Sequence, residues 1–433
     1  MDSHHVAAAF RRWTAPPRAL AMALLMAAGS AFAADAPLTL VEAQRLALER
    51  SHLLVAQQAA VASARDMAVA AGQLPDPIAT MGVNNMPVNG PDAFTLTRDF
   101  MTMTSVGVMQ EFTRQEKRDA RAARFEREAD QALAERAASM ASIQREAALA
   151  WLDRFYAAAM LAATAEQIHQ ARAEVDAAET AYRAGRGSLQ DVLAARSALV
   201  SLDDRASELN RRARSARIAL ARWVGDAADA PLADKPHMDT VRLDVPNLDA
   251  ELAHHPQVAV LASREALAAA EVRTAEASRK PDWSLALMYS QRGSAYSNMV
   301  SINVSVPLQW DRANRQDREL AAKLSLLDQA RAEREDALRA HTAEMRAMIA
   351  EWENDRERAG RYARELVPLA SERTQAALAA YRGGKASLAD VLLARRNEID
   401  VRLQTLQLEM DTARLWAQLN FQLPDADAAG ATH

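Results

Sequence analysis

One stretch of sixteen residues occurs twice in this chain, and it constrains the fold more than any other feature. Residues 181–196 (AYRAGRGSLQDVLAAR) return 199 positions later as residues 380–395 (AYRGGKASLADVLLAR), and eleven of the sixteen positions are identical. Each copy lies between two long helical patterns, so the chain consists of two related halves. We therefore expect one duplicated domain, although 433 residues would allow two or three separate ones.

The inner part of each copy predicts a helix end, a tight turn and a new helix. A glycine permits the left-handed backbone of a helix C-terminus, and the serine three residues later is a natural N-cap. An aspartate then takes the third helical position, where a carboxylate meets the positive end of the helix dipole. These residues are Gly185, Ser188 and Asp191 in the first copy, and Gly384, Ser387 and Asp390 in the second. Each copy therefore predicts a helix-turn-helix tip, although a helical hairpin with no further role remains an alternative.

The N-terminus reads as a secretory signal peptide, residues 1–33. Three arginines precede an apolar run over residues 19–28, and Ala31-Phe32-Ala33 suits cleavage. No other stretch approaches the roughly 20 apolar residues of a membrane-spanning helix. Cleavage leaves 49 basic and 56 acidic residues, a balance that argues against nucleic acid as a partner. The chain has no cysteine, which excludes disulfides and thiolate metal sites.

The duplication extends beyond the tips. Helical patterns over Leu38–Gln73 and Leu252–Arg279 both end at a Pro-Asp pair, Pro75-Asp76 in the first half and Pro281-Asp282 in the second. We expect the two halves to be a first repeat over residues 34–242 and a second repeat over residues 243–424, followed by a flexible tail over residues 425–433.

After each Pro-Asp pair the hydrophobic period changes from helical to two. Residues 283–289 and 300–308 alternate clearly and predict a β-hairpin, and residues 79–83 and 104–112 form a weaker counterpart. Strands of about ten residues suit a tilted transmembrane strand, while a hairpin that caps a soluble helical bundle is the alternative. Four strands are too few to close a barrel, which needs about eight. An open sheet edge is unstable in lipid, because its backbone amides would lack hydrogen-bond partners. If the hairpins span a membrane, several chains must pool them.

A very long helix follows each hairpin. Gln115–Tyr182 contains no proline or glycine, and Arg312–Arg382 is interrupted only by Gly360 and Pro368. About 70 residues at 1.5 Å each reach about 100 Å. The charged residues of these helices are typical of solvent-exposed faces with ion pairs at i, i+4. The helices have few large apolar residues, so neither can form a core alone, and each needs neighbouring helices on two sides.

This order of elements, with the two Gly-x-x-Ser-Leu-x-Asp-Val-Leu tips, resembles the TolC-like outer-membrane efflux factors over residues 38–422. The resemblance implies a fold that is mainly α with a small β part: a duplicated long-helix α-barrel, plus two β-hairpins that contribute to a trimeric 12-stranded transmembrane β-barrel. It also implies a passive exit duct of a tripartite pump, whose partners are a periplasmic adaptor (membrane fusion) protein, an inner-membrane RND-type transporter and outer-membrane lipid. It implies no cofactor.

The family's gate and contact positions transfer to the tips residue by residue. The resemblance implies a channel gate at Tyr182, Asp191, Tyr381 and Asp390. It implies exposed adaptor contacts at Arg183, Gly185, Ser188, Leu189, Arg382, Gly384, Ser387 and Leu388. Two positions depart from the pattern of the best-known member of the family. Leu393 stands where that member has a second ring of acidic residues, and Ala386 stands where it has an arginine that links the gate. Physically, a ring of carboxylates in a narrow neck favours cations, whereas helix capping is the plainer role of the two aspartates.

The segments 72–77, 84–87, 99–103 and 110–112 are similar to members that serve heavy-metal pumps of the CzcC and CusC type, so we expect heavy-metal cations as cargo. A multidrug or type I secretion channel is the alternative. Five methionines near the first hairpin suit Cu(I) or Ag(I), although lipid-facing or gap-filling methionine is the plainer interpretation. They are Met81, Met86, Met101, Met103 and Met109. The His254-His255 pair reads as a helix end, and we predict no resident metal site.

Other classes of protein fit the pattern less well. A periplasmic adaptor usually has one helical hairpin flanked by β-domains, and a secreted coiled coil would show sustained heptads without period-two segments. No nucleophile elbow, metal-ligand triad or phosphate loop is visible, so we expect no enzyme.

Overall fold

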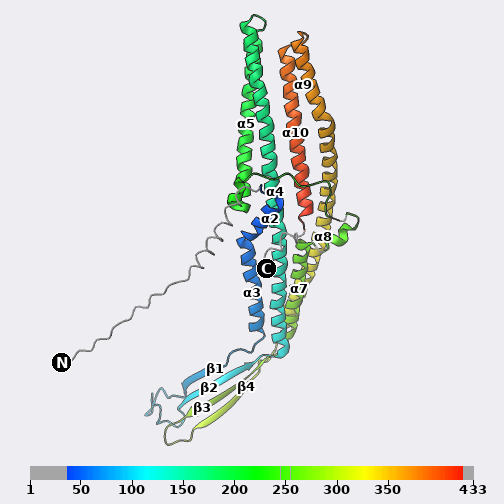
Figure 1. Ribbon diagram of the computed structural model, residues 1–433. Coiled ribbons are helices and arrows are strands. Elements are labelled where there is room, and N and C mark those ends of the chain that lie inside the picture. Colours follow the sequence, from blue (N-terminus) through cyan, green and yellow to red (C-terminus); the bar gives the residue numbers. More distant parts are fainter. Residues whose placement is uncertain (1–36, 244, 254, 423–433) are drawn as a thin grey trace, which may run out of the picture.

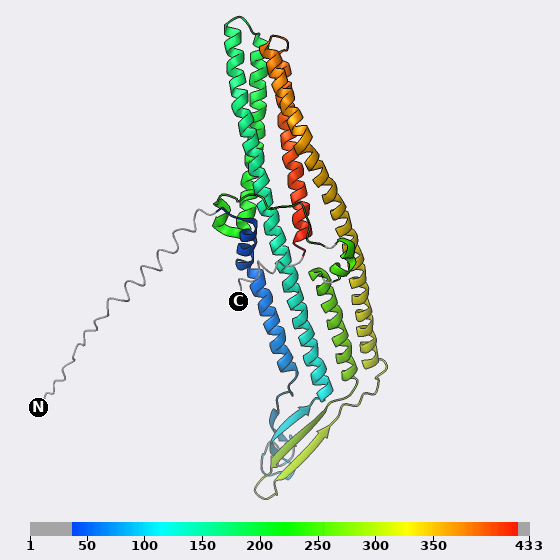
Figure 2. The same cartoon turned by 45° about the vertical axis from the view of Figure 1, so that its right-hand side comes forward.

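The computed structural model describes residues 37–243, 245–253 and 255–422. The expected signal peptide and the tail over residues 425–433 lie outside these residues, and the division of the chain at residue 242 stays a prediction. The molecule is elongated: two helical hairpins extend to one end, and an antiparallel sheet occupies the other (Figures 1 and 2). Among the described helices, none combines the length and apolar character needed to cross a membrane.

Each half contributes one hairpin of long helices and one pair of shorter helices near the sheet. The helices are α2 (Leu40–Glu49), α3 (His52–Ala71), α4 (Gln115–Arg183), α5 (Leu189–Val224), α6 (Leu248–Leu252), α7 (Pro256–Ser278), α8 (Gln316–Arg361), α9 (Val367–Arg382) and α10 (Leu388–Asn420). Two short 3₁₀ helices cover Gly225–Asp229 and Val245–Asn247.

The first long helix matches its prediction, and the second differs from it. Helix α4 runs for 69 residues without a break, about 100 Å, because nothing in its sequence interrupts the hydrogen-bond ladder. The second long helix begins at Gln316, not at Arg312, and contains a π-helical turn over Tyr362–Leu366. Pro368 lies two residues after that turn, and its missing amide explains why the ladder shifts there instead of breaking.

The two helices nearest the sheet differ from their predictions. The first is divided at Arg50, where Ser51 caps α3 by accepting a hydrogen bond from the Leu54 amide at 3.4 Å. The second was predicted to begin at Leu252 but begins at Pro256, whose missing amide is harmless at the first helical position. Leu252 instead ends the short helix α6.

The four strands form one antiparallel sheet in the order β1 (Ile78–Asn84), β2 (Met103–Phe112), β3 (Trp283–Gln291) and β4 (Met299–Ser305). Both predicted hairpins are present, and pairing of β2 with β3 joins them. Phe112 and Trp283 stack at this junction with ring centroids 4.3 Å apart. Strand β4 ends at Ser305, three residues before the predicted end.

The main core lies at the waist, where the long helices meet the linker between the halves. Trp151, Tyr156, Leu220, Trp352 and Trp416 belong to this core cluster. The indole of Trp151 donates a hydrogen bond to the Leu38 carbonyl at 2.9 Å, and that of Trp416 donates to the Thr240 carbonyl at 2.9 Å. These bonds tie the segment at Leu38 and the linker between the halves to the long helices, so the sheet and the tips extend from a common centre.

Candidate functional site

The two tips are built as the repeated sequence predicts. Gly185 has a φ of 71° and Gly384 a φ of 68°, the left-handed region that glycine adopts without steric cost. The Arg186 amide donates to the Ala181 carbonyl at 2.9 Å, and the Gly185 amide donates to the Tyr182 carbonyl at 3.0 Å. Together these bonds end α4 in a Schellman motif, and the second tip repeats them.

A complete capping box begins the returning helix at each tip. In the first, the Asp191 amide donates to the Ser188 hydroxyl oxygen at 3.1 Å, and the Ser188 amide donates to the Asp191 carboxylate at 3.0 Å. Ser387 and Asp390 form the same box on α10. Hydrogen bonds from the serine hydroxyl and amide hold the pKa of Asp191, and likewise that of Asp390, below its usual value. Both carboxylates are therefore charged caps at the tip surface.

The remaining predicted tip residues differ between the copies. Tyr182 and Leu189 are exposed, at 46% and 53%. Tyr381 is half-buried against a small core between the two hairpins, and Leu388 is only 5% exposed within that core. The expectation that Leu388 presents an exposed contact is wrong, because the second tip turns this side chain toward the first hairpin.

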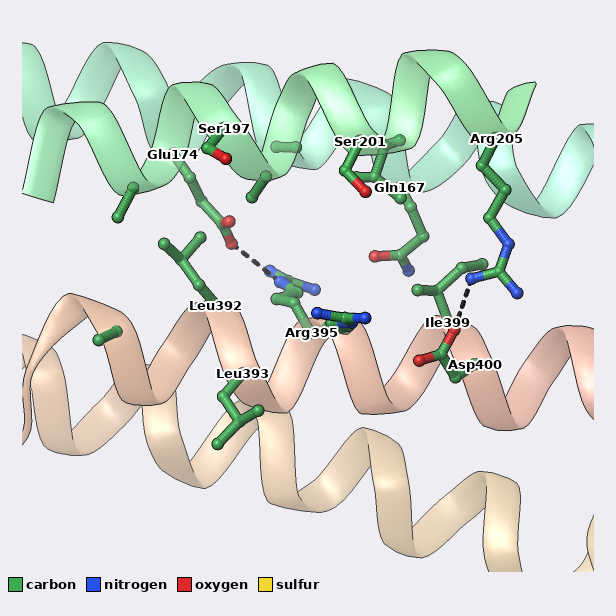
Figure 3. A pocket seen from close by; sticks show the side chains of 16 residues that line it. Gln167, Glu174, Ser197, Ser201, Arg205, Leu392, Leu393, Arg395, Ile399 and Asp400 are labelled. Atoms are coloured by element: carbon green, nitrogen blue, oxygen red, sulfur yellow. Dashed lines mark hydrogen bonds and ion pairs between the residues drawn. The ribbon is translucent and has the colours of Figure 1, made fainter. Parts of the chain in front are cut away.

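A polar contact between the two hairpins was missed by sequence reasoning. Arg395 of α10 reaches across to Glu174 of α4 at 2.9 Å and also contacts Gln170. On the same helix, Glu398 is 3% exposed and its carboxylate lies 2.9 Å from the Arg402 guanidinium. Figure 3 shows Arg395 and Glu174 at a cavity of about 550 Å³ between α4, α5 and α10.

The repeat offered one signal for this contact. Arg196 is the counterpart of Arg395, and both end their sixteen-residue copies. Arg196, however, binds Glu179 within its own hairpin, at 2.5 Å. Only the packing of the second hairpin against the first gives Arg395 its partner on α4, so the sequence marks the arginine but not its role.

At the opposite end of the molecule, the sheet has two faces of different character. Because paired residues share a face, the register places one set of mostly apolar side chains together, which we call the apolar face. It comprises Ala79, Met81, Val83, Thr104, Val106, Val108, Gln110, Phe112, Trp283, Leu285, Leu287, Tyr289, Gln291, Val300, Ile302 and Val304. Val300, Ile302 and Val304 are 66%, 69% and 64% exposed, so the described chain leaves this face uncovered.

Residues 247–423 match the family model described as outer membrane efflux protein. This match lies in the second half of the chain. A comparison with curated proteins gave no match.

Several solved structures share the fold over nearly the whole chain. The OprN channel superposes with a TM-score of 0.75 at 18% identity, over 89% of this chain and 89% of that chain. CusC gives 0.74 at 16% identity, over 88% and 91%. VceC from Vibrio cholerae gives 0.73 at 20% identity, over 89% and 96%. The predicted fold class, long duplicated helices with a small antiparallel part, is confirmed.

His255, one of the two histidines considered as metal ligands, lies at a helix end. His255 caps α7 by accepting a hydrogen bond from the Gln257 amide at 3.3 Å, and its other ring nitrogen lies 3.0 Å from the Gln422 side-chain oxygen. Burial, together with the nearby His341 ring, lowers the pKa of His255 to about 4. His254 lies outside the described residues. Within those residues, no group of three or more histidine and acidic side chains is placed to hold a metal ion.

Proposed function

We propose that this chain is the outer-membrane exit duct of a tripartite efflux pump and works as a homotrimer. Each copy contributes its four strands to one 12-stranded barrel and its long helices to a tunnel below it. An adaptor protein and an inner-membrane RND-type transporter supply the cargo and the energy.

The sheet carries this proposal. Its apolar face is exposed over all four strands, which suits contact with lipid. Strands β1 and β4 each have one unpaired side, since the order is β1-β2-β3-β4 without closure. Unpaired amides are costly in lipid, so each edge needs a neighbour. Pairing of β4 with β1 of the next copy removes both edges, and three copies give twelve strands.

The helices near the sheet support assembly as well. Helix α3 leaves Leu53, Val55, Met67 and Val69 exposed, at 54%, 67%, 46% and 67%. Its inner side packs on α4, and this apolar outer side has no partner in the described part of the chain. A neighbouring copy would cover it, which favours assembly along the helices as well as through the sheet.

At the tips, we propose the roles that the resemblance implies. Tyr182, Asp191, Tyr381 and Asp390 form the gate, and the exposed residues of both turns meet the adaptor. Leu388 is buried, so it supports the second tip by packing and is not a contact. A threefold set of charged caps at the narrow end would favour cations over anions.

The gate hypothesis is tested with Asp191→Asn combined with Asp390→Asn. The asparagine oxygen can still accept the capping hydrogen bond, so the change removes charge while the turn is retained. In planar bilayers, cation selectivity should fall toward neutrality. Unchanged selectivity would show that the two carboxylates act as caps alone.

The duct itself is tested by extraction from the membrane fraction. An integral barrel should resist salt and carbonate and require detergent, whereas an adaptor or a secreted coiled coil would be released without it. Release by carbonate alone would contradict an outer-membrane duct.

For cargo, we propose heavy-metal cations, on the similarity of the first-hairpin segments to the CzcC and CusC type. A deletion strain should become sensitive to copper, silver, zinc, cobalt or cadmium while hydrophobic drugs are tolerated as before. Sensitivity to drugs alone would favour the multidrug alternative and leave the duct intact.

A further inference from the structure

The face of the sheet opposite the apolar face carries methionines in an ordered arrangement. We call it the polar face; it comprises Ile78, Thr80, Gly82, Asn84, Met103, Ser105, Gly107, Met109, Glu111, Ser284, Ala286, Met288, Ser290, Met299, Ser301, Asn303 and Ser305. Most of these side chains are small or polar, and four are methionines. The apolar face carries one methionine, Met81. The methionines of this sheet therefore concentrate on the face where apolar gap-filling is least needed.

Three of these methionines form a diagonal line across neighbouring strands. Met288 of β3 is paired with Gly107 of β2, two residues from Met109, and with Ser301 of β4, two residues from Met299. Diagonal neighbours two residues apart in register lie about 7–8 Å apart, within reach of long side chains. The three methionines thus lie on one diagonal, from Met109 toward the helical end of the sheet to Met299 toward its outer loops.

The paired neighbours of Met288 and Met299 are small. Gly107 has no side chain beside Met288, and Ser290 is the paired residue beside Met299. Met109 and Met288 are half-buried, and Met299 is 45% exposed. The polar face includes no lysine or arginine in the paired register, and its one charged residue is Glu111, next to Met109 at the helical end. A cation therefore meets no repulsive charge along this line.

From this arrangement we propose that Met109, Met288 and Met299 form a relay site for soft monovalent cations, of the Cu(I) and Ag(I) class. Thioether sulfur is a soft, uncharged ligand that prefers such ions over Zn²⁺ or other harder divalent ions. Adjacent and equivalent sites allow a bound ion to pass from one sulfur to the next, as conduction requires binding that is favourable but not tight. The inference rests on the proposed function, because the trimer turns the polar face toward the lumen.

Oxidation footprinting tests the site directly in the purified, detergent-solubilised protein. Peroxide converts free methionine to sulfoxide, and a sulfur that donates its lone pair to a metal is protected. Silver nitrate in chloride-free buffer should slow oxidation of Met109, Met288 and Met299 together, by about tenfold when roughly nine in ten sites are filled. Met81 on the apolar face should be unaffected, and zinc nitrate should protect none of the four.

Leucine variants complete the test. The combined change Met109→Leu, Met288→Leu and Met299→Leu conserves volume and is tolerated in packed structures, and Met81→Leu is the matched control. Silver binding by titration should disappear in the triple variant and persist in the control. Unprotected methionines in the wild-type protein, or equal silver binding by the triple variant, would overturn the relay. The proposed duct is tested by a different result: a monomeric or carbonate-soluble preparation would contradict the duct, whatever the outcome for silver binding.

Discussion

The joint between sheet and helices depends on one carboxylate, Asp282. Its side chain lies 2.6 Å from the Lys117 ammonium and accepts a hydrogen bond from the Arg114 amide at 3.1 Å, just before α4 begins. The two side chains are only 12% and 14% exposed. Asp76 is its counterpart in the first half, but it is exposed and has no such partner among the described residues. The repeat thus supplies a matched pair of sites, of which only one is engaged.

We predict that Asp282→Ala loosens this joint and that Asp76→Ala does not. Removing one partner of a fully buried ion pair costs about 3–5 kcal/mol, and the residual solvent access at this site lowers the expected loss to about 2–3 kcal/mol. At about 1.4 kcal/mol for each factor of ten, local opening becomes about 30- to 150-fold more frequent.

Hydrogen exchange with mass spectrometry measures this opening in peptides that cover residues 110–121. Amide exchange there should accelerate by the stated factor in Asp282→Ala, while the tips keep their wild-type rates. Equal rates in the two variants, or a change spread over the whole molecule, would refute the view that this ion pair holds the joint locally.

Three further predictions concern the tip, the waist and the sheet. Ser188→Ala removes an N-cap worth about 1 kcal/mol, so exchange in the first turn of α5 should accelerate about fivefold, while Ser215→Ala, exposed in the same helix, changes nothing. Because the pKa of His255 is lowered in the folded protein, this histidine becomes protonated at a higher pH in the unfolded state than in the folded state. Thermal stability should therefore fall as the pH drops from about 6.5 to about 4. His255→Asn, which can still cap, should flatten that decline, and an unchanged profile would assign the acid sensitivity elsewhere. Gly107→Ala places a Cβ 2.7 Å from a backbone carbonyl of β3 and should reduce the yield of folded protein, whereas Gly82→Ala meets nothing within 4 Å and should be tolerated.

Local signals account for the parts of the fold that the sequence predicts well. Gly185, Ser188 and Asp191 act on the backbone within a few residues of themselves. The sequence alone therefore predicts where the helix before the turn ends and where the helix after it begins. The absence of proline and glycine from residues 115–182 likewise sets the length of α4. The alternation of apolar and polar residues predicts the strands, because it depends only on the sequence of each strand and not on its neighbours.

Features that depend on contacts between distant segments were not predictable in this way. Leu189 and Leu388 occupy the same place in the repeat, yet one is exposed and the other is buried by packing between the hairpins. Arg395 finds Glu174 across 221 positions of sequence. The diagonal of Met109, Met288 and Met299 likewise requires the register between β2, β3 and β4, which alternation within single strands does not provide.

The oligomeric mass of the detergent-extracted protein tests the central claim most directly. The account holds that four strands with two open edges are stable in lipid only when three copies close them into one barrel. Native mass spectrometry should therefore give three times the mass of the chain as exported, with no monomer until the detergent complex is denatured. A folded monomer of the same extracted protein would contradict the account.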